Sequence, residues 1–175
     1  RMAEEISKQA KKQGKLGKIH IKLETGMNRI GFNDTQESVE EIVRISQLPN
    51  IQIEGIFSHF CASDEADKAS AHKQLERYSY FVKQLEAKGI NIPIKHLSNS
   101  GGILDLPEAE YDMVRSGIIT YGLYPSAQVD KERIKLMPAM ELKSRVVYVK
   151  ELGPNEGISY GSTYITKEKT RVATV

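Results

Sequence analysis

Apolar and polar residues are arranged along most of this chain in a way that predicts alternating strands and helices. The stretch IHIKLETG, which begins at Ile19, alternates apolar and polar side chains and therefore predicts a strand with two different faces. In residues 34–50 apolar positions recur at helical spacing, and Asp34 or Thr35 stands where a helix N-cap is expected. IQIEGIFSHF then predicts a second strand.

The alternation continues through the next part of the chain. A long helix is predicted from about residue 64 to residue 88, and Gly89 ends it as a C-cap residue does. IPIKHLSNS predicts a third strand, GGILDLP a short helical turn, and YDMVRSGIITYG a fourth strand or a strand followed by a turn. Strands that alternate with helices favour right-handed crossovers and a parallel sheet. Four such units make half of a (β/α)8 barrel or most of a small doubly wound sheet.

The pattern changes near residues 124–140, after which strands follow one another without helices. ELKSRVVYVKEL, GISYGSTYI and TRVATV are separated by Gly-Pro and polar turns. We therefore predict an α/β domain over residues 1–128 and the start of an all-β domain over residues 129–175. The first residues read as a helix already under way and the last as an unfinished strand. We expect the sequence to be an internal piece of a longer chain.

Composition then excludes several classes of protein. A formal charge of +2 over 175 residues is too small to indicate a nucleic acid or an anionic membrane as partner. No apolar run approaches the length of a membrane span, and no signal peptide is visible. The single cysteine, Cys61, excludes an internal disulfide and suits a reducing compartment. We expect a soluble, cytoplasmic domain.

Candidate chemistry gathers where the predicted parallel strands end, which is where α/β folds place their sites. Four consecutive strand ends carry polar groups: Lys22, Glu24, Thr25 and Arg29; Ser58, His59 and Cys61; His96, Ser98, Asn99 and Ser100; Arg115, Ser116 and Gly117. The small residues of SNSGG and SGI offer backbone N–H groups to an anion, and barrels often bind phosphate in their last two loops. Taken singly, His59 also fits a hydrogen-bonded core histidine, and Arg115 fits half of a structural ion pair.

Several familiar motifs are missing from the sequence. The four histidines are scattered, and no metal-binding HxxxH or CxxC spacing occurs, so we predict no metal site. The sequence also has no GxGxxG, no Walker loop and no GxSxG elbow.

Five stretches, in this order and spacing, closely resemble the alanine racemases: KLETGMNRIGF, GIFSHFCASDE, HLSNSGGILDLP, MVRSGIITYGLYP and GISYGSTY. The resemblance runs from Lys18 to Val175. It implies a pyridoxal 5′-phosphate (PLP) enzyme with an N-terminal (β/α)8 barrel and a C-terminal β domain. The chain would then be the second half of that barrel followed by the first strands of the β domain.

The resemblance also implies roles for individual residues. Tyr160 matches one of the two catalytic bases and acts in the active site of the partner subunit. Arg115 matches the arginine that faces the pyridine nitrogen, and His59 matches the histidine that hydrogen-bonds that arginine. The other matches are Arg29, beside the substrate carboxylate; Lys22, often carbamylated, which braces Arg29; and Ser100, Gly117 and Ile118, with Asn99 nearby, at the phosphate.

The implied function is the interconversion of L-alanine and D-alanine by two bases, in a cytoplasmic homodimer that supplies D-alanine for peptidoglycan. A cation beside the pyridine nitrogen would lower that nitrogen's pKa, and a tyrosine base needs nearby positive charge to work near neutrality. Glu24 and Asn28 stand where the family usually has Asp and Gly, and Ser116 replaces a common proline.

Other functions stay open at this point. One is a racemase of serine or another amino acid, and a second is a non-catalytic PLP-binding barrel. The lysine that forms the Schiff base in the family lies upstream of this sequence, so we expect these 175 residues to be inactive on their own.

Overall fold

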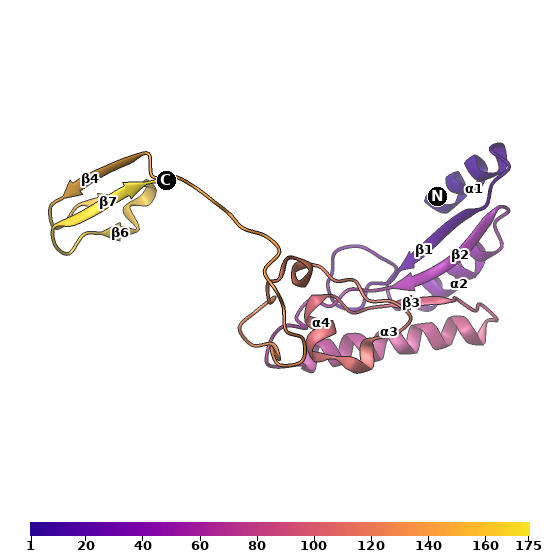
Figure 1. Cartoon of the computed structure of the whole chain (residues 1–175). Coiled ribbons are helices and arrows are strands. Elements are labelled where there is room, and N and C mark those ends of the chain that lie inside the picture. Colours follow the sequence, from indigo (N-terminus) through magenta and orange to yellow (C-terminus); the bar gives the residue numbers. More distant parts are fainter. The chain divides into compact units, whose positions relative to one another are not determined.

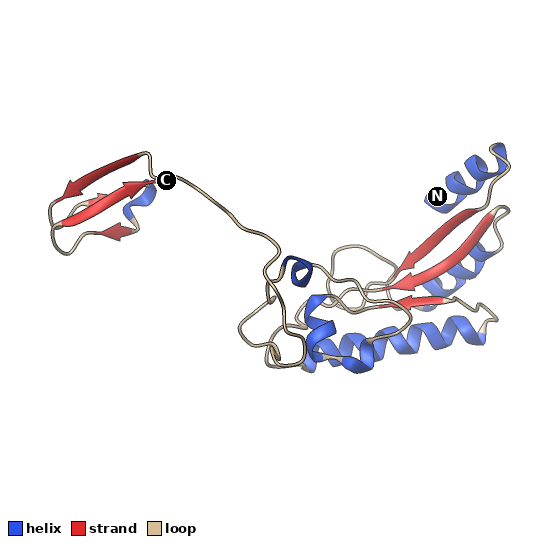
Figure 2. Cartoon of the chain, in the orientation of Figure 1, coloured by secondary structure: helices blue, strands red, loops and turns tan.

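The computed structural model describes all residues, 1–175, and divides into two compact units, Arg1–Ala139 and Met140–Val175 (Figure 1). Unit 1 contains a parallel three-stranded sheet in the order β1-β2-β3, made of β1 (Gly17–Lys22), β2 (Ile51–Phe57) and β3 (Ile94–His96). Its helices are α1 (Met2–Lys12), α2 (Gln36–Ser46), α3 (Ala69–Ala87) and α4 (Ser100–Asp105), as Figure 2 shows. The predicted parallel sheet with intervening helices is therefore present.

The two faces of this sheet differ in character. Ile21 of β1 and Ile56 of β2 pair in register and belong to the hydrophobic core together with residues of α2 and α3. Tyr78 of α3 is fully buried there, and its hydroxyl donates to the Ile56 carbonyl oxygen at 2.8 Å. Burial of each such side chain contributes about 1.5–3 kcal/mol. Side chains alternate across a strand, so the opposite face carries the polar residues of the same strands.

Two predicted elements of unit 1 differ in the structure. The long helix begins at Ala69 rather than near residue 64, because the Asp67 carboxylate accepts the Ala69 N–H at 2.9 Å and ends the preceding loop. The fourth strand is reduced to a single parallel bridge between His96 and Met113, flanked by the hydrogen bond from Arg115 N to Ser98 O at 3.0 Å. The chain then turns into the short 3₁₀ helix η2 (Ile118–Tyr121). The remaining short helix of this unit, η1 (Pro107–Ala109), follows α4 directly.

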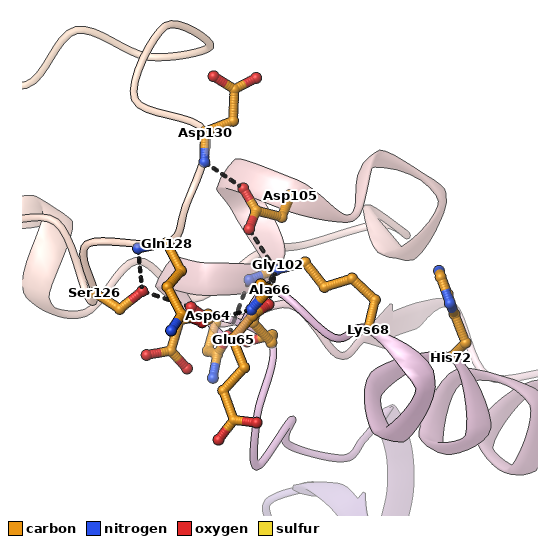
Figure 3. Close-up of polar contacts among 12 residues, drawn as sticks. Asp64, Glu65, Ala66, Lys68, His72, Gly102, Asp105, Ser126, Gln128 and Asp130 are labelled. Atoms are coloured by element: carbon orange, nitrogen blue, oxygen red, sulfur yellow. Dashed lines mark hydrogen bonds and ion pairs between the residues drawn. The ribbon is translucent and has the colours of Figure 1, made fainter.

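A polar cluster holds the last part of unit 1 against the loop before α3 (Figure 3). The Lys68 ammonium forms an ion pair with Asp105, whose other carboxylate oxygen accepts the Asp130 N–H at 2.9 Å. The Gln128 side-chain oxygen accepts the Ala66 N–H at 2.6 Å. These contacts fix residues 126–130 to α4 and to the β2–α3 loop.

Unit 2 is built of short antiparallel strands. β4 (Tyr148–Leu152) pairs with β7 (Thr170–Thr174), and β5 (Gly157–Ile158) pairs with β6 (Tyr164–Ile165). Tyr160 was expected in a strand, but it opens the 3₁₀ turn η3 (Tyr160–Ser162) between β5 and β6. The strand breaks there because Ser159, Gly161 and Ser162 all have positive φ. No helix of the chain is long and apolar enough to cross a membrane.

Candidate active site

Arg115 is the centre of a hydrogen-bond network at the carboxyl ends of β2 and β3. Its Nη1 donates to His96 Nδ1 at 2.6 Å, and its Nη2 donates to the Ser58 carbonyl oxygen at 2.7 Å. The same Nη2 lies 3.2 Å from His59 Nδ1 and 3.2 Å from the Leu97 carbonyl oxygen. Every one of these acceptors is neutral, so no carboxylate in this network neutralises the guanidinium. The structure thus disfavours the simple ion pair that the sequence left open.

The contact with Arg115 fixes the tautomer of His96. A guanidinium can only donate, so His96 Nδ1 must accept and its proton must sit on Nε2. His96 Nε2 lies 2.9 Å from His20 Nδ1, and His20 Nε2 lies 3.6 Å from the Glu54 carboxylate. Burial, Arg115 and His20 together lower the pKa of His96 to about 4. At neutral pH His96 is therefore a neutral acceptor.

A glycine makes the link between these two histidines possible. His20 and Gly55 are directly paired across β1 and β2, and a Cβ at Gly55 would lie 2.4 Å from the His20 ring. The missing side chain lets the His20 ring cross β2 and reach His96 on β3. The His96 ring stacks in parallel on Phe57, with ring centroids 4.9 Å apart.

Three further predicted site residues lie on the same rim. Burial lowers the pKa of His59, and the charges of Arg115, Arg29 and Lys22 lower it further. Burial also lowers the pKa of Lys22; Glu24 opposes this effect, whereas Arg29 and Arg115 reinforce it. The Lys22 ammonium donates to the Leu23 carbonyl oxygen. Lys22, Arg29, His59 and Arg115 are therefore near enough to influence one another electrostatically, and their positive charges make this rim electropositive.

The loop that carries Arg29 is ordered by Glu24. The Glu24 carboxylate accepts the Gly26 N–H at 2.7 Å and the Arg29 N–H at 3.1 Å, so it caps the loop from within. Burial alone would raise the pKa of Glu24, but the backbone N–H groups of Asn28, Gly26 and Arg29 lower it to about 2. The Arg29 side chain is exposed and makes no hydrogen bond within the chain.

Unusual backbone conformations explain other residues of this loop. Asn28 has a φ of 54°, a left-handed conformation that asparagine tolerates, and so it can stand where the family usually has glycine. Gly31 has a φ of 128°, and a Cβ there would lie 2.8–2.9 Å from the backbone of residues 22–24. The close approach allows Phe32 N to donate to Lys22 O, which returns the loop to the end of β1.

The predicted phosphate positions lie on the neighbouring loops. Ser100 is the first residue of α4, and its hydroxyl oxygen accepts the Gly117 N–H at 2.9 Å. This leaves the Ser100 hydroxyl proton free to be donated. Ile118 opens η2, whose first N–H groups have no partner within the helix. Asn99 instead caps α4 through Gly102 N and accepts the Ser63 hydroxyl at 2.7 Å, so it positions the loop.

Tyr160 belongs to unit 2. Its side chain is 99% exposed and makes no hydrogen bond within the chain. No group of three or more His, Cys, Asp or Glu side chains in the structure is arranged to hold a metal ion.

Comparison with known proteins identifies the source of this arrangement. Residues 1–125 match the family model for the alanine racemase N-terminal domain, and residues 139–175 match that for the C-terminal domain. The chain belongs to the alanine racemase family. The alanine racemase of Clostridium perfringens is 49% identical over 173 residues, covering 99% of this chain and 45% of that protein.

Solved alanine racemases also share the fold. The enzyme of Clostridium difficile 630 superposes with a TM-score of 0.82 at 44% identity and covers 98% of this chain and 45% of its own. A structure of that enzyme in complex with cycloserine gives a TM-score of 0.81 at 44% identity, over 85% of this chain and 41% of its own. The expected class, a portion of a (β/α)8 barrel followed by strands of a β domain, is thereby confirmed. The chain spans less than half the length of these relatives.

Sequence reasoning gave no role to two residues of the Arg115 network, His96 and His20. His96 was predicted to lie among the polar residues at the strand ends, though without a role of its own, and His20 could have been suspected because it alternates with Ile19 and Ile21 on the polar face of its strand. Their contact could not be predicted, since it depends on the pairing of three strands and on the space above Gly55.

Proposed function

We propose that this chain forms the second half of the PLP-binding barrel, residues 1–128, and the start of the C-terminal β domain, residues 129–175, of an alanine racemase. The full-length protein interconverts L-alanine and D-alanine, works as a cytoplasmic homodimer and supplies D-alanine for peptidoglycan. The observation that carries this proposal is Arg115, a cation at the strand ends held only by neutral acceptors. A structural ion pair would have a carboxylate there, whereas a fixed cation beside a ring nitrogen would keep that nitrogen unprotonated.

The residues present suit the phosphate and the ring of PLP. A Cβ built on Gly117 would meet only the Ser100 hydroxyl, at 3.3 Å, so there is space at this backbone for an anion. Ser100, Gly117 and Ile118 supply a hydroxyl and backbone N–H groups, which are the donors that phosphate sites use. Asn99 caps α4, the helix that begins with Ser100. When bound, PLP supplies an electron sink for negative charge at the substrate α-carbon.

The protein's own groups then divide the remaining work. His96 and His59 hold the Arg115 guanidinium in a fixed orientation, in which it would serve as the cation beside the ring nitrogen of PLP. Arg29 binds the substrate carboxylate, and Lys22 lies behind it as a second positive charge. The Tyr160 hydroxyl, in the active site of the partner subunit, accepts or returns the α-proton on one face of the substrate.

The test is the Tyr160→Phe variant of the full-length racemase, with Tyr164→Phe as its control. Removing the hydroxyl preserves the ring, so folding should be unchanged. Exchange of the α-proton with deuterated solvent should fall selectively for L-alanine and persist for D-alanine. Equal and small losses for both enantiomers would show that Tyr160 is structural. Tyr164, a second exposed tyrosine in the same hairpin, should tolerate the same change without loss of exchange.

A further inference from the structure

One buried amide of α3, Gln74, touches both of the loops that carry the predicted site residues. Gln74 is only 2% exposed. Its Nε2 donates to Thr25 Oγ1 at 3.2 Å and to the His59 carbonyl oxygen at 2.9 Å, and its Oε1 accepts the Cys61 N–H at 3.0 Å. One carboxamide thus joins the loop after β1 to the loop after β2.

The hydrogen bond between Gln74 and Thr25 is the first of a series that leads to the residue holding Arg115. Thr25 Oγ1 accepts from Gln74, so its proton is available to Ser58 Oγ at 2.8 Å, and Ser58 Oγ donates in turn to the Leu23 carbonyl oxygen at 2.8 Å. The Ser58 carbonyl oxygen is the acceptor of Arg115 Nη2. The Thr25 and Ser58 hydroxyls are both buried and both paired, so each hydrogen bond of this series has one defined direction.

The backbone of the Arg29 loop is shaped around the same side chain. A Cβ at Gly26 would lie 3.1 Å from Gln74 Cγ, and Gly26 has a φ of 147°. The Glu24 carboxylate accepts the N–H groups of both Gly26 and Arg29, so it ties the backbone at these two positions together. Any displacement of Gln74 would therefore move the backbone from which the Arg29 side chain extends.

We propose that Gln74 is a positioning residue of the racemase, which fixes the Arg29 loop relative to the His59–Arg115 pair. The effect on catalysis rests on the proposed function, whereas the three hydrogen bonds of Gln74, here called the Gln74 clamp, are a property of this chain. The position requires two donors and one acceptor on a single buried group, which only a carboxamide provides. Glutamate would place an oxygen against the His59 carbonyl oxygen, and methionine would remove all three hydrogen bonds that the Gln74 amide makes.

The first measurement is amide hydrogen exchange on the full-length protein. The Gln74→Glu and Gln74→Met variants should speed exchange at the Gly26 and Arg29 amides and leave α2 protected. Gln84→Glu is the matched control, since Gln84 is on the same helix and makes no side-chain hydrogen bond. Equal acceleration throughout the chain would mean that Gln74 contributes only global stability, and this would overturn the proposal. An unchanged exchange rate at Gly26 and Arg29 would do the same.

The second measurement is a double-mutant cycle in the full-length racemase. Gln74→Glu should lower kcat/KM by up to about 100-fold, mostly through KM for alanine, because the carboxylate-binding arginine is misplaced. In an Arg29→Ala background the same change should cost at least about fivefold less. Equal losses in both backgrounds would show that Gln74 does not act through Arg29. If the unmutated protein lacks racemase activity, the proposed function fails, while hydrogen exchange still decides whether the clamp exists.

Discussion

Replacing Glu24 by glutamine should remove a pH-dependent part of the stability of unit 1. The Glu24 side chain is largely buried, and its carboxylate holds the loop of residues 24–29 through backbone N–H groups. Its pKa falls from the ordinary value of 4.5 to about 2. At ~1.4 kcal/mol per pKa unit, this difference corresponds to ~3 kcal/mol of stability.

The sign of the pH dependence follows from where the proton binds. Above pH 4.5 the carboxylate is ionised in both the folded and the unfolded chain, so the full contribution is present. As the pH falls from 4.5 toward 2, the unfolded chain takes up a proton that the folded chain does not, and the contribution is lost. About 2 of the ~3 kcal/mol should have disappeared at pH 3.

Glutamine keeps one acceptor oxygen, but its amide group turns donors toward the remaining N–H groups. Solvent at the strand ends and the retained acceptor reduce the expected loss for Glu24→Gln to ~1–3 kcal/mol at pH 7. Urea unfolding followed by far-UV circular dichroism at pH 7 and pH 3 measures the free energy of unfolding at each pH. The difference in free energy of unfolding between the original protein and the variant should be less than half as large at pH 3 as at pH 7.

The control is Glu40→Gln, which removes the same charge from an exposed position on α2 whose carboxylate accepts only the Gln36 amide. It should change the free energy of unfolding by less than ~0.5 kcal/mol at both pH values. If Glu24→Gln lowered the free energy of unfolding equally at pH 7 and pH 3, the reasoning would be refuted, because the lost stability could then not come from the ionised carboxylate.

Two further predictions concern the same rim. In a histidine NMR titration His96 should stay neutral until the pH falls to about 4. Arg115→Leu should raise this midpoint toward the ordinary value of 6.5, because it removes the cation, whereas a midpoint near 6.5 in the unmutated protein would contradict the Arg115–His96 contact. In the same urea assay, Gly31→Ala should destabilise unit 1 by more than the ~1–2 kcal/mol of a left-handed alanine, because the new Cβ would meet backbone atoms. Gly14→Ala is the control: Gly14 has a φ of 61° and open space around it, so the change should cost only ~1–2 kcal/mol.

Several features of this protein could be predicted from local sequence, because they depend on neighbours along the chain. The β1 strand and α2 follow from apolar spacing, and the N-cap of α2 is Thr35, whose hydroxyl accepts the Ser38 N–H at 3.3 Å. Gly89 follows α3 with a φ of 78°, the conformation expected of a residue after a helix. The gathering of Lys22, His59 and Arg115 at one edge follows from the rule that parallel strands end on the same side.

Other features were beyond sequence reasoning because they depend on distant segments. The predicted fourth strand is only a bridge at Met113, and Tyr160 stands in a 3₁₀ turn set by the left-handed residues around it. Neighbouring residues of SNSGG also have different roles in the folded chain: the Ser100 hydroxyl accepts the Gly117 N–H, whereas the Asn99 side chain caps α4.

The sequence by itself therefore determined the order of the elements and which residue types stand at the strand ends, since backbone propensity and side-chain alternation act over a few residues. Only the tertiary structure decided how those residues interact. His96 accepts from Arg115 because the segment around Met113 returns alongside the end of β3, and His20 reaches His96 because Gly55 leaves room above β2. Hydrogen bonds of this kind depend on distances of a few tenths of an ångström, which are set by the packing of the sheet and helices and not by the spacing of residues along the chain.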